Sequence, residues 1–469
     1  MSSSNKPLLE GATKVLADFA VDVTYEQIPG EVIGKMKASL LDSIGCCLYG
    51  VTLPWTKSVQ AMIEDEGAEP IASIFGANKK TSVAGAALIN GTAGHAFELD
   101  DIHKESIVHA GSIAIPTLIA FSELNGKTSG KELLTAMTVG YELGTRIGNA
   151  ATMELFFKGF HPQGTSGVFV AAAIAGKMLK LDKRLMQHCL GIAGSQAGGL
   201  MAAQEGATVK RFHSGRAAQS GVYSALLAKK GLTGIDDVLE ASYGGYLSTY
   251  SGKPNAKRLT EDLGVVWEAG KVGYKLHACV TSIHTALDAF AGLIKEYCLT
   301  PDLIKQVDVG LSPMTYTHCA WEYKGQSVTA AQMNLFYGMA VIAFDGVAFV
   351  RQYSEDVILQ PHLMNFIKRV RAHVDQEIEA MGPAFRHASR VTVTTVDGRS
   401  FTREILHRHG SPEHPLSYED VKYKFRNVAS VCLSQVDLER VIELTETIDQ
   451  LDRIHELIDL LAKPTHYST

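Results

Sequence analysis

The chain has 469 residues, a formal net charge of −6 and 46% hydrophobic residues. This composition is typical of a folded globular protein, excludes disorder as the main state and gives enough chain for two or three domains. The absence of a basic excess or stripe argues against a nucleic acid partner. Seven cysteines without a Cys-x-x-Cys pair argue against a disulfide framework and a zinc ribbon.

The first half of the chain predicts helices. Residues 31–49 place apolar side chains three and four positions apart, which is the stripe of an amphipathic helix. Residues 133–148 and 167–180 continue this pattern. The polar stretch that contains Gly126 and Gly130 predicts the turn between two helices.

The pattern changes after about residue 272. Residues 306–311 alternate apolar and polar side chains, as a half-buried strand does. Residues 390–404 alternate on both sides of Asp397-Gly398, and this dipeptide between two strand-like runs predicts a hairpin. We therefore expect a sheet in this part of the chain.

Helical spacing returns near the C-terminus, at residues 417–427 and through 436–461, where only His455 interrupts the apolar stripe. We expect a mainly α protein with two domains. These are a large all-helical domain, formed by residues 1–272 and 409–469, and a smaller α+β lid domain, formed by residues 273–408.

The sequence also indicates a soluble, cytoplasmic protein without a membrane partner. The N-terminal segment MSSSNKPLLEGATK lacks the apolar core of a signal peptide. The longest apolar run, residues 335–350, contains Asp345 and is shorter than the ~20 residues that cross a bilayer.

Acid and imidazole side chains are densest in residues 90–112, where Asp100, Asp101, His103 and His109 lie within ten residues. Such pairs suit proton transfer, because imidazole titrates near neutral pH and a neighbouring carboxylate fixes its tautomer and raises its pKa. The alternatives are a solvated helix cap and a divalent metal site. We predict no metal, since neither a helical His-x-x-x-His pair nor a His-Glu-x-x-His motif is present.

Three further segments contain the side chains that a carboxylate substrate requires. Their basic and imidazole residues are His161 in 159–167; Lys210, Arg211, His213 and Arg216 in 208–221; and Lys275, His277 and His284 in 272–289. The second segment is a candidate anion site, with a solvated helix face as the alternative. Phosphate loops, dinucleotide fingerprints and Gly-x-Ser-x-Gly elbows are missing, so nucleotide chemistry and serine hydrolysis have no support.

These motifs, in the order NG-x-x-x-H-x-x-x-x-DD-x-H…HAG, FHP…G, K-x-x-H-x-G-x-A-A and YK…H-x-ALDA, resemble the MmgE/PrpD family over residues 8 to 461. The family includes 2-methylcitrate dehydratase, cis-aconitate decarboxylase and iminodisuccinate epimerase. The resemblance implies a large helical domain closed by a small α+β lid, with the active site between them in a homodimer. It also implies catalysis without a metal or organic cofactor.

The resemblance extends to individual positions. Glu98 stands where the family's decarboxylases carry an aspartate, and Ile102 where they carry a threonine. Their lid histidine aligns with Val280, and His277 is the nearest candidate to replace it. The predicted catalytic residues are His109, His161, Lys210, His103 and Asp101. The predicted substrate-binding residues are Glu98, Ile102, Lys275, His277 and Tyr337, the last as a lid tyrosine that faces the pocket.

The function implied is proton transfer at the carbon α to a carboxylate in a small di- or tricarboxylic acid. A hydro-lyase similar to 2-methylcitrate dehydratase is placed first, because the departures at Glu98, Ile102 and Val280 count against cis-aconitate decarboxylation. A decarboxylase or an epimerase is the alternative, since all three reactions pass through one enolate-like charge. A non-catalytic binding protein of the same fold is the second alternative.

Overall fold

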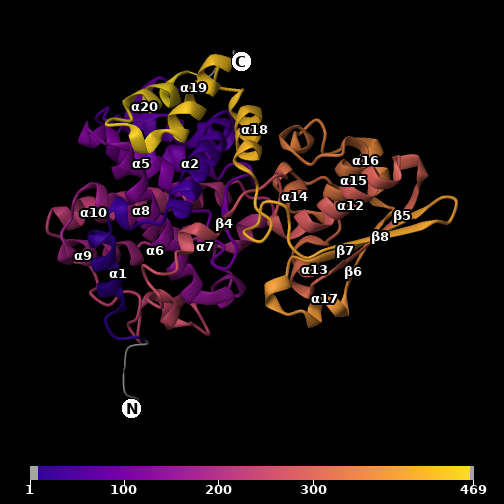
Figure 1. The fold of residues 1–469 in the computed structure, drawn as a ribbon, viewed down its shortest axis with the longest axis horizontal. Coiled ribbons are helices and arrows are strands. Elements are labelled where there is room, and N and C mark those ends of the chain that lie inside the picture. The colour runs from indigo at the N-terminus through magenta and orange to yellow at the C-terminus, as the bar shows by residue number, and fades with distance from the viewer. Residues whose placement is uncertain (1–8, 465–469) are drawn as a thin grey trace.

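The computed structural model describes residues 9–464 and confirms a mainly α protein. Figure 1 shows a larger helical part beside a smaller part that carries a sheet. Residues 1–8, the first part of the N-terminal segment MSSSNKPLLEGATK, lie outside the described residues, as do residues 465–469. Among the described residues, no helix is long and apolar enough to cross a membrane.

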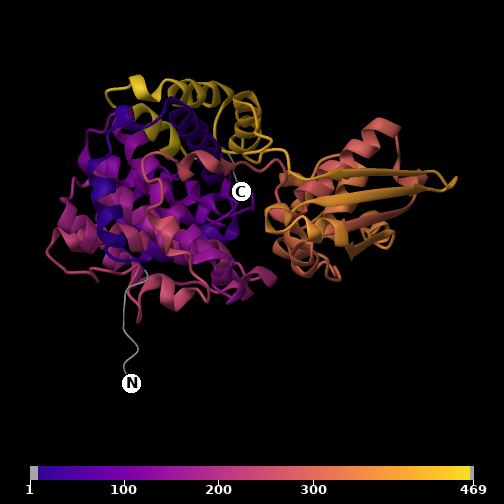
Figure 2. The same cartoon turned by 60° about the horizontal axis from the view of Figure 1, so that its bottom comes forward.

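The larger part is built from helices of both ends of the chain, and Figure 2 shows the C-terminal ones lying over it. Its helices are α1 (Ala12–Asp22), α2 (Gly30–Gly50), α3 (Pro54–Glu66), α4 (Val83–Gly94), α5 (Gly111–Asn125), α6 (Gly130–Phe157), α7 (Pro162–Thr165), α8 (Gly167–Met178), α9 (Lys183–Gly194), α10 (Val209–Lys229), α11 (Tyr246–Tyr250), α18 (Tyr418–Ala429), α19 (Gln435–Glu446) and α20 (His455–Ala462). The predicted helices at 31–49, 133–148, 167–180 and 417–427 are confirmed as α2, α6, α8 and α18.

The centre of the larger part is a close packing of α4, α5, α8 and α10. Every residue of α4 is buried, which fits a helix that is apolar or small-sided all round. Glycines let the helices approach. A Cβ on Gly215 of α10 would lie 2.2 Å from the Leu88 carbonyl oxygen and 2.3 Å from Thr92 Oγ1 on α4. This packing fixes the start of α10, where two cations of the candidate site lie.

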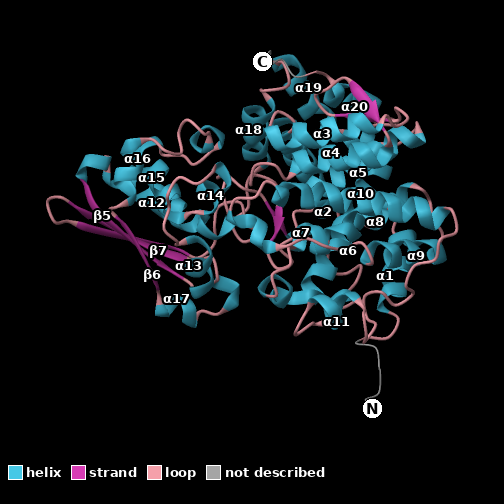
Figure 3. Cartoon of the chain, turned by 180° about the vertical axis from the view of Figure 1, so that it is seen from behind, coloured by secondary structure: helices cyan, strands magenta, loops and turns pink. Residues whose placement is uncertain are grey.

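The smaller part contains a four-stranded sheet, drawn in magenta in Figure 3, in the order β6-β5-β7-β8. The strands are β5 (Ile304–Leu311), β6 (Val370–Val374), β7 (Ser389–Thr395) and β8 (Ser400–Ile405). The predicted strand at 306–311 and the hairpin around Asp397-Gly398 are confirmed as β5 and β7–β8. The parallel pairing of β5 with β6 was not predicted, because a long helical crossover separates them in the sequence.

Helices surround this sheet and complete a second hydrophobic core. They are α12 (His284–Tyr297), α13 (Pro313–Cys319), α14 (Val328–Met333), α15 (Leu335–Asp345), α16 (Pro361–Ile367) and α17 (Gln376–Ala380). Helix α12 packs on β7 and β8. On β7 buried and half-buried residues alternate, as expected for a sheet with one covered face.

The chain passes between the two parts at two places that lie side by side. The first is β4 (Val272–Gly273), which also pairs with β3 (Ile102–His103), and the second is the segment around Gly410. The Tyr274 N–H donates to the Gly410 carbonyl over 2.8 Å. The sequence-based boundaries at 272 and 408 lie at these passages. That they delimit domains that move independently stays a prediction.

The continuous helical pattern expected through residues 436–461 is broken between α19 and α20. The backbone there bonds to the turn before α6: the Gly130 N–H donates to the Leu451 carbonyl, and the Ile454 N–H donates to the Thr128 carbonyl. These donors and acceptors are fixed by tertiary partners, so they are not all available to one helix. His455, which interrupts the stripe, is the first residue of α20.

Replacing Gly215 with alanine tests the helix packing that holds α10. We expect Gly215→Ala to lose about 1–3 kcal/mol of stability, because overpacking of backbone against backbone has little room to relax. The matched control is Gly34→Ala on the exposed side of α2, where nothing lies within 4 Å of an added Cβ. This change should be neutral or add about 0.5–1 kcal/mol. The melting temperatures of both variants measure this difference in stability, and equal melting temperatures would contradict the close packing at Gly215.

Candidate active site

A cavity of about 70 Å³ lies between the two parts. The larger part contributes the loop from 98 to 109, His161 and the start of α10, and the smaller part contributes residues of α13, α14 and the loops before α12 and β7. The polar residues that line it are Glu98, Lys104, His109, His161, Gln204, Lys210, Lys275, Thr281, Ser282, His318, Arg386 and His387. A small cavity with so many charged and imidazole side chains is suited to a small anionic ligand.

The Glu98 carboxylate is buried among three cations. Lys210 Nζ contacts its Oε1, Arg211 Nη1 lies 2.6 Å from Oε1, and Lys275 Nζ lies 3.2 Å from Oε2. Burial by itself raises the carboxyl pKa, but the neighbouring charges outweigh it and hold the pKa of Glu98 well below its usual range. Three cations against one carboxylate leave two net positive charges, which attract an anionic ligand.

Backbone strain marks the loop that carries Glu98. Glu98 has φ 55° and Ile107 also has φ 55°, in the left-handed region that side chains rarely adopt, and both residues line the cavity. Such strain costs on the order of 1–3 kcal/mol per residue and persists only where the surroundings impose it. Here the clamp of cations on Glu98 provides that constraint.

Lys210 and Arg211 lie in the first turn of α10, a 21-residue helix. The partial positive charge of a helix N-terminus adds to theirs and favours anions. Burial lowers the pKa of Lys210 to about 8, although Glu98 favours its charged form. Arg211 also reaches the smaller part, because its Nη2 donates to Gln332 Oε1 over 3.0 Å.

A second buried group consists of His95, Asp100 and His109. His95 Nδ1 lies 2.7 Å from Asp100 Oδ2, His109 Nδ1 lies 3.4 Å from the same oxygen, and the two imidazole rings meet edge to face. Burial lowers the pKa of His95 to about 4, so this ring is neutral near pH 7. Burial raises the pKa of Asp100, but His109 and His95 hold it well below its usual range. The carboxylate therefore orients His109 at the cavity wall.

The same three side chains could hold a metal ion, because their ligand atoms all lie within 4.8 Å of one another. Among the described residues, His95 Nε2, Asp100 Oδ1 and His109 Nδ1 have no hydrogen-bond partner of good geometry. The donor set suits zinc or a similar ion, yet His95 Nδ1 already contacts Asp100 Oδ2 at 2.7 Å. Catalysis without a metal stays a prediction, which activity after chelation tests.

A further imidazole pair adjoins this group, because the ring centroids of His95 and His161 are 5.7 Å apart. His161 is the residue before α7, and His213 lies one turn into α10. Their Nδ1 atoms are 2.9 Å apart. His161 lines the cavity, whereas His213 is only half-buried and does not.

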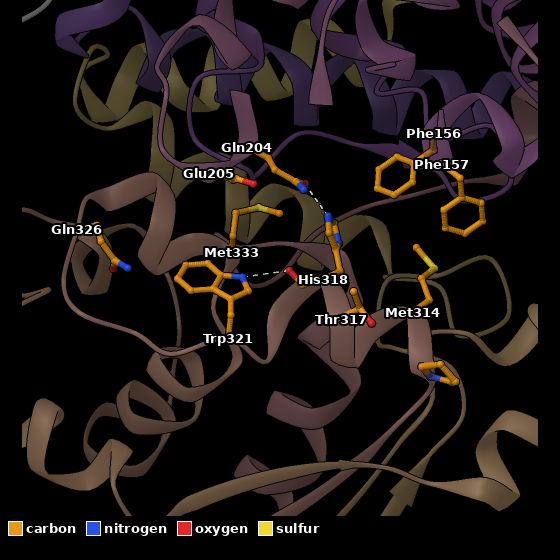
Figure 4. Close-up of a pocket in the computed structure, with 11 residues that line it drawn as sticks. Phe156, Phe157, Gln204, Glu205, Met314, Thr317, His318, Trp321, Gln326 and Met333 are labelled. Carbon is orange, nitrogen blue, oxygen red and sulfur yellow. Dashed lines mark hydrogen bonds between the residues drawn. The ribbon is translucent and has the colours of Figure 1, made fainter. Parts of the chain in front are cut away.

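An apolar hollow of about 810 Å³ adjoins the charged cavity. Figure 4 shows aromatic and methionine side chains around it, including Phe157 and Trp321, with His318 between them and Gln204. His318 Nε2 contacts Gln204 Oε1 at 2.5 Å, and both residues line the hollow and the cavity. Burial lowers the pKa of His318 to about 4. The hollow therefore offers apolar surface rather than cations.

Comparison with known proteins assigns this arrangement to a family. Residues 14–258 match the MmgE/PrpD N-terminal domain, and residues 277–450 match the MmgE/PrpD C-terminal domain. The chain belongs to the MmgE/PrpD family. The family membership predicted from the sequence is confirmed.

Three similar members of the family have names that refer to cis-aconitate decarboxylase. The chain is 32% identical to the cis-aconitate decarboxylase of Aspergillus terreus, with 98% of each chain covered. It is 31% identical to the cis-aconitate decarboxylase-like protein oryM of Aspergillus oryzae, with 96% of each covered. It is 28% identical to the cis-aconitate decarboxylase of Homo sapiens, with 98% of this chain and 96% of that one covered. The expectation of an enzyme of the MmgE/PrpD family is confirmed.

Six of the ten sequence-predicted site residues line the charged cavity of this family member: Glu98, Ile102, His109, His161, Lys210 and Lys275. Asp101 and His103 do not. Asp101 accepts from Tyr141 Oη and from the Gly111 N–H, and His103 contacts Glu268 at 3.0 Å. Burial raises the pKa of Asp101 to about 7. These contacts anchor the loop and the start of α5 rather than touch a ligand.

His277 and Tyr337 also lie away from the cavity lining. His277 Nε2 contacts Asp288 at 3.0 Å, and Tyr337 Oη donates to the Gln352 carbonyl inside the core of the smaller part. His277 therefore does not take the place of the family's lid histidine in this structure. Val280, which aligns with that histidine, does line the cavity.

Sequence reasoning missed the side chains that the smaller part brings to the cavity. His318 lies on the short helix α13, and Arg386 and His387 precede β7. His318 stands among uncharged residues, and Arg386 and His387 only precede a predicted strand, so the local sequence gave no signal of a site. Only the fold brings them to the loop at Glu98.

The charge of Lys210 can be tested through the binding of a tricarboxylate such as citrate. We expect its affinity to fall as the pH rises through about 8, because the ammonium that attracts the anion then loses its proton. Lys210→Arg should abolish this alkaline loss, since a guanidinium stays charged. Isothermal titration across the range measures it, with Lys57→Arg on the exposed side of α3 as control. Equal pH dependence in the Lys210 and Lys57 variants would show that another group titrates.

Proposed function

We propose that this chain is a cofactor-free decarboxylase of a small unsaturated tricarboxylic acid, with cis-aconitate as the first substrate to test. The observation that carries the proposal is the single cavity in which Lys210 and Lys275 face His109 and His161. The names of the full-length relatives favour decarboxylation over the dehydration that the sequence analysis placed first. Glu98, which the resemblance places where the family's decarboxylases carry an aspartate, keeps a carboxylate at this position.

The reaction needs stabilisation of negative charge and one proton. The bond between carbon and the departing carboxylate breaks, CO₂ leaves, and the electron pair stays on the carbon. That charge spreads into a remaining carboxylate, where the ammonium groups of Lys210 and Lys275 stabilise it in a site of low dielectric. A cavity imidazole then donates a proton, a C–H bond forms, and a dicarboxylate is released.

In this proposal, the role of Glu98 is to position the cations. Its carboxylate holds Lys210, Arg211 and Lys275 in place before a ligand arrives, so little reorganisation is needed when the substrate binds. The cations keep a net positive charge that the substrate carboxylates satisfy. Arg211, which lies behind the cavity wall, orients Glu98 rather than the substrate.

We propose that the smaller part, residues 273–408, closes on the larger part as a lid. It contributes Thr281, His318 and Arg386 to the cavity, and the two parts are joined by only two passages of chain that lie side by side. Closure would exclude water from the cation cluster and strengthen its field.

Small-angle scattering tests the lid. A saturating tricarboxylate should reduce the radius of gyration, because closure compacts the molecule. The comparison is the radius of gyration of the Glu98→Ala variant with the same anion. This variant has lost the carboxylate that orders the three cations. An unchanged radius in the wild-type protein, together with measured binding, would contradict closure.

We propose a homodimer located in the cytoplasm, with a small carboxylate as its substrate and with neither nucleic acid nor membrane as a partner. Size determination in solution and cell fractionation test the first two.

Release of CO₂ from cis-aconitate tests the proposed reaction. His109→Ala should lose about 10²–10⁴-fold in kcat, as expected for a lost acid or base. Lys275→Ala should lose about 10²–10³-fold, by analogy with a lost oxyanion donor. The control is His373→Gln, on the exposed face of β6, which should keep wild-type activity. Melting curves exclude unfolding as the cause.

The products distinguish the reactions of the family. Loss of water from a hydroxylated tricarboxylate without release of CO₂ would replace the decarboxylase with a hydro-lyase. Exchange of an α-proton for deuterium with inversion, and no other product, would replace it with an epimerase.

A further inference from the structure

The contact between His161 and His213 has an unusual geometry. The two Nδ1 atoms face each other at 2.9 Å, so one ring carries a proton on Nδ1 and donates it to the bare Nδ1 of the other. With Nδ1 committed, each ring has only Nε2 for other partners. His161 lines the cavity, whereas His213 is half-buried and does not line it.

The backbone around the pair holds this geometry. The His161 N–H donates to the Gly199 carbonyl over 3.0 Å, and a Cβ on Gly199 would lie 3.3 Å from the His213 ring. Gly199 has φ 133°, which favours glycine. Both rings therefore lie against Gly199, a residue without a side chain in the loop between α9 and α10.

The charges around the pair keep both imidazoles neutral at rest. Burial, followed by the charge of Lys210, lowers the pKa of His161 well below its usual range. Burial and Lys210 also lower the pKa of His213. His95 and His109 are the other titratable groups beside His161. A neutral pair that gains a proton at one end is poised to release one at the other.

The proposed decarboxylation creates a need for such a route. Each turnover consumes one proton, because the carbon that loses CO₂ gains a hydrogen. Because His161 is neutral, the loss of its Nε2 proton would leave an imidazolate unless a proton reaches its Nδ1 at the same time.

We propose that His161 protonates the substrate carbon and that His213 supplies His161 with a proton from the solvent side. This inference rests on the proposed decarboxylation. His213 acts through His161 and does not touch the substrate. It is thus a positioning and relay residue that neither the motifs nor the cavity lining assigns.

The transfer balances at each nitrogen. His213 gains a solvent proton at Nε2 and gives its Nδ1 proton to Nδ1 of His161. His161 gives its Nε2 proton to the carbon, whose electron pair forms the new C–H bond. Both rings end neutral with their tautomers exchanged. The reverse movement restores the tautomers after the product has left and water has entered the cavity.

Steady-state kinetics with cis-aconitate test the relay in two variants. His213→Gln keeps a hydrogen-bonding side chain against His161 but cannot pass a proton through it. His213→Ala leaves space for a free imidazole. We expect kcat to fall about 10²-fold in both variants, in the range of a lost general acid, while KM changes little because the substrate contacts remain. Added imidazole should raise kcat of His213→Ala but not of His213→Gln or of the exposed control His373→Gln.

The outcomes separate the relay from the reaction itself. If the wild-type protein releases no CO₂ from any tricarboxylate, the proposed function fails and the relay fails with it. If the wild type is active and the two His213 variants keep its kcat, only the relay fails. A loss of kcat that imidazole does not restore, with a raised KM, would assign His213 a structural role. The glutamine variant, which fills the same space, keeps the test valid if the alanine variant melts early.

Discussion

The interaction on which the rest of the site depends is the burial of the Glu98 carboxylate among Lys210, Arg211 and Lys275. Buried ion clusters are poor sources of stability, because the cost of removing charges from water offsets most of their attraction. Here the cluster also imposes a strained backbone at Glu98. A cluster that costs free energy through both desolvation and backbone strain is expected where it serves binding or catalysis.

The cluster also determines how the two parts of the molecule meet. Its members come from the loop after α4, the start of α10 and the segment after β4, and Arg211 extends it to Gln332 on α14. Gln332 in turn donates to the carbonyls of Phe97 and Ala278. The residues that attract an anion therefore also fix the position of the smaller part on the larger one.

Local sequence predicted those features that local forces decide. The helix at 31–49 and the hairpin at Asp397-Gly398 follow from side-chain periodicity and turn chemistry, and both are present. The break before His455 was missed because its backbone bonds to a distant turn. Asp101 and His103 have the same spacing whether they face a ligand or hold a loop. Resemblance to a family identified Lys275 and Glu98, whereas His318 reaches the cavity only through the three-dimensional fold.

The division of the cavity wall between the two parts has an evolutionary consequence. Lys104 and Lys210 lie on the larger part, whereas Val280, Thr281 and His318 stand on the smaller one together with Lys275 and Arg386. Substitutions in the smaller part can therefore exchange the group that faces the reacting carbon while the seat for the carboxylates stays intact. A lineage can change which bond of a polycarboxylate is broken without first losing the ability to bind it.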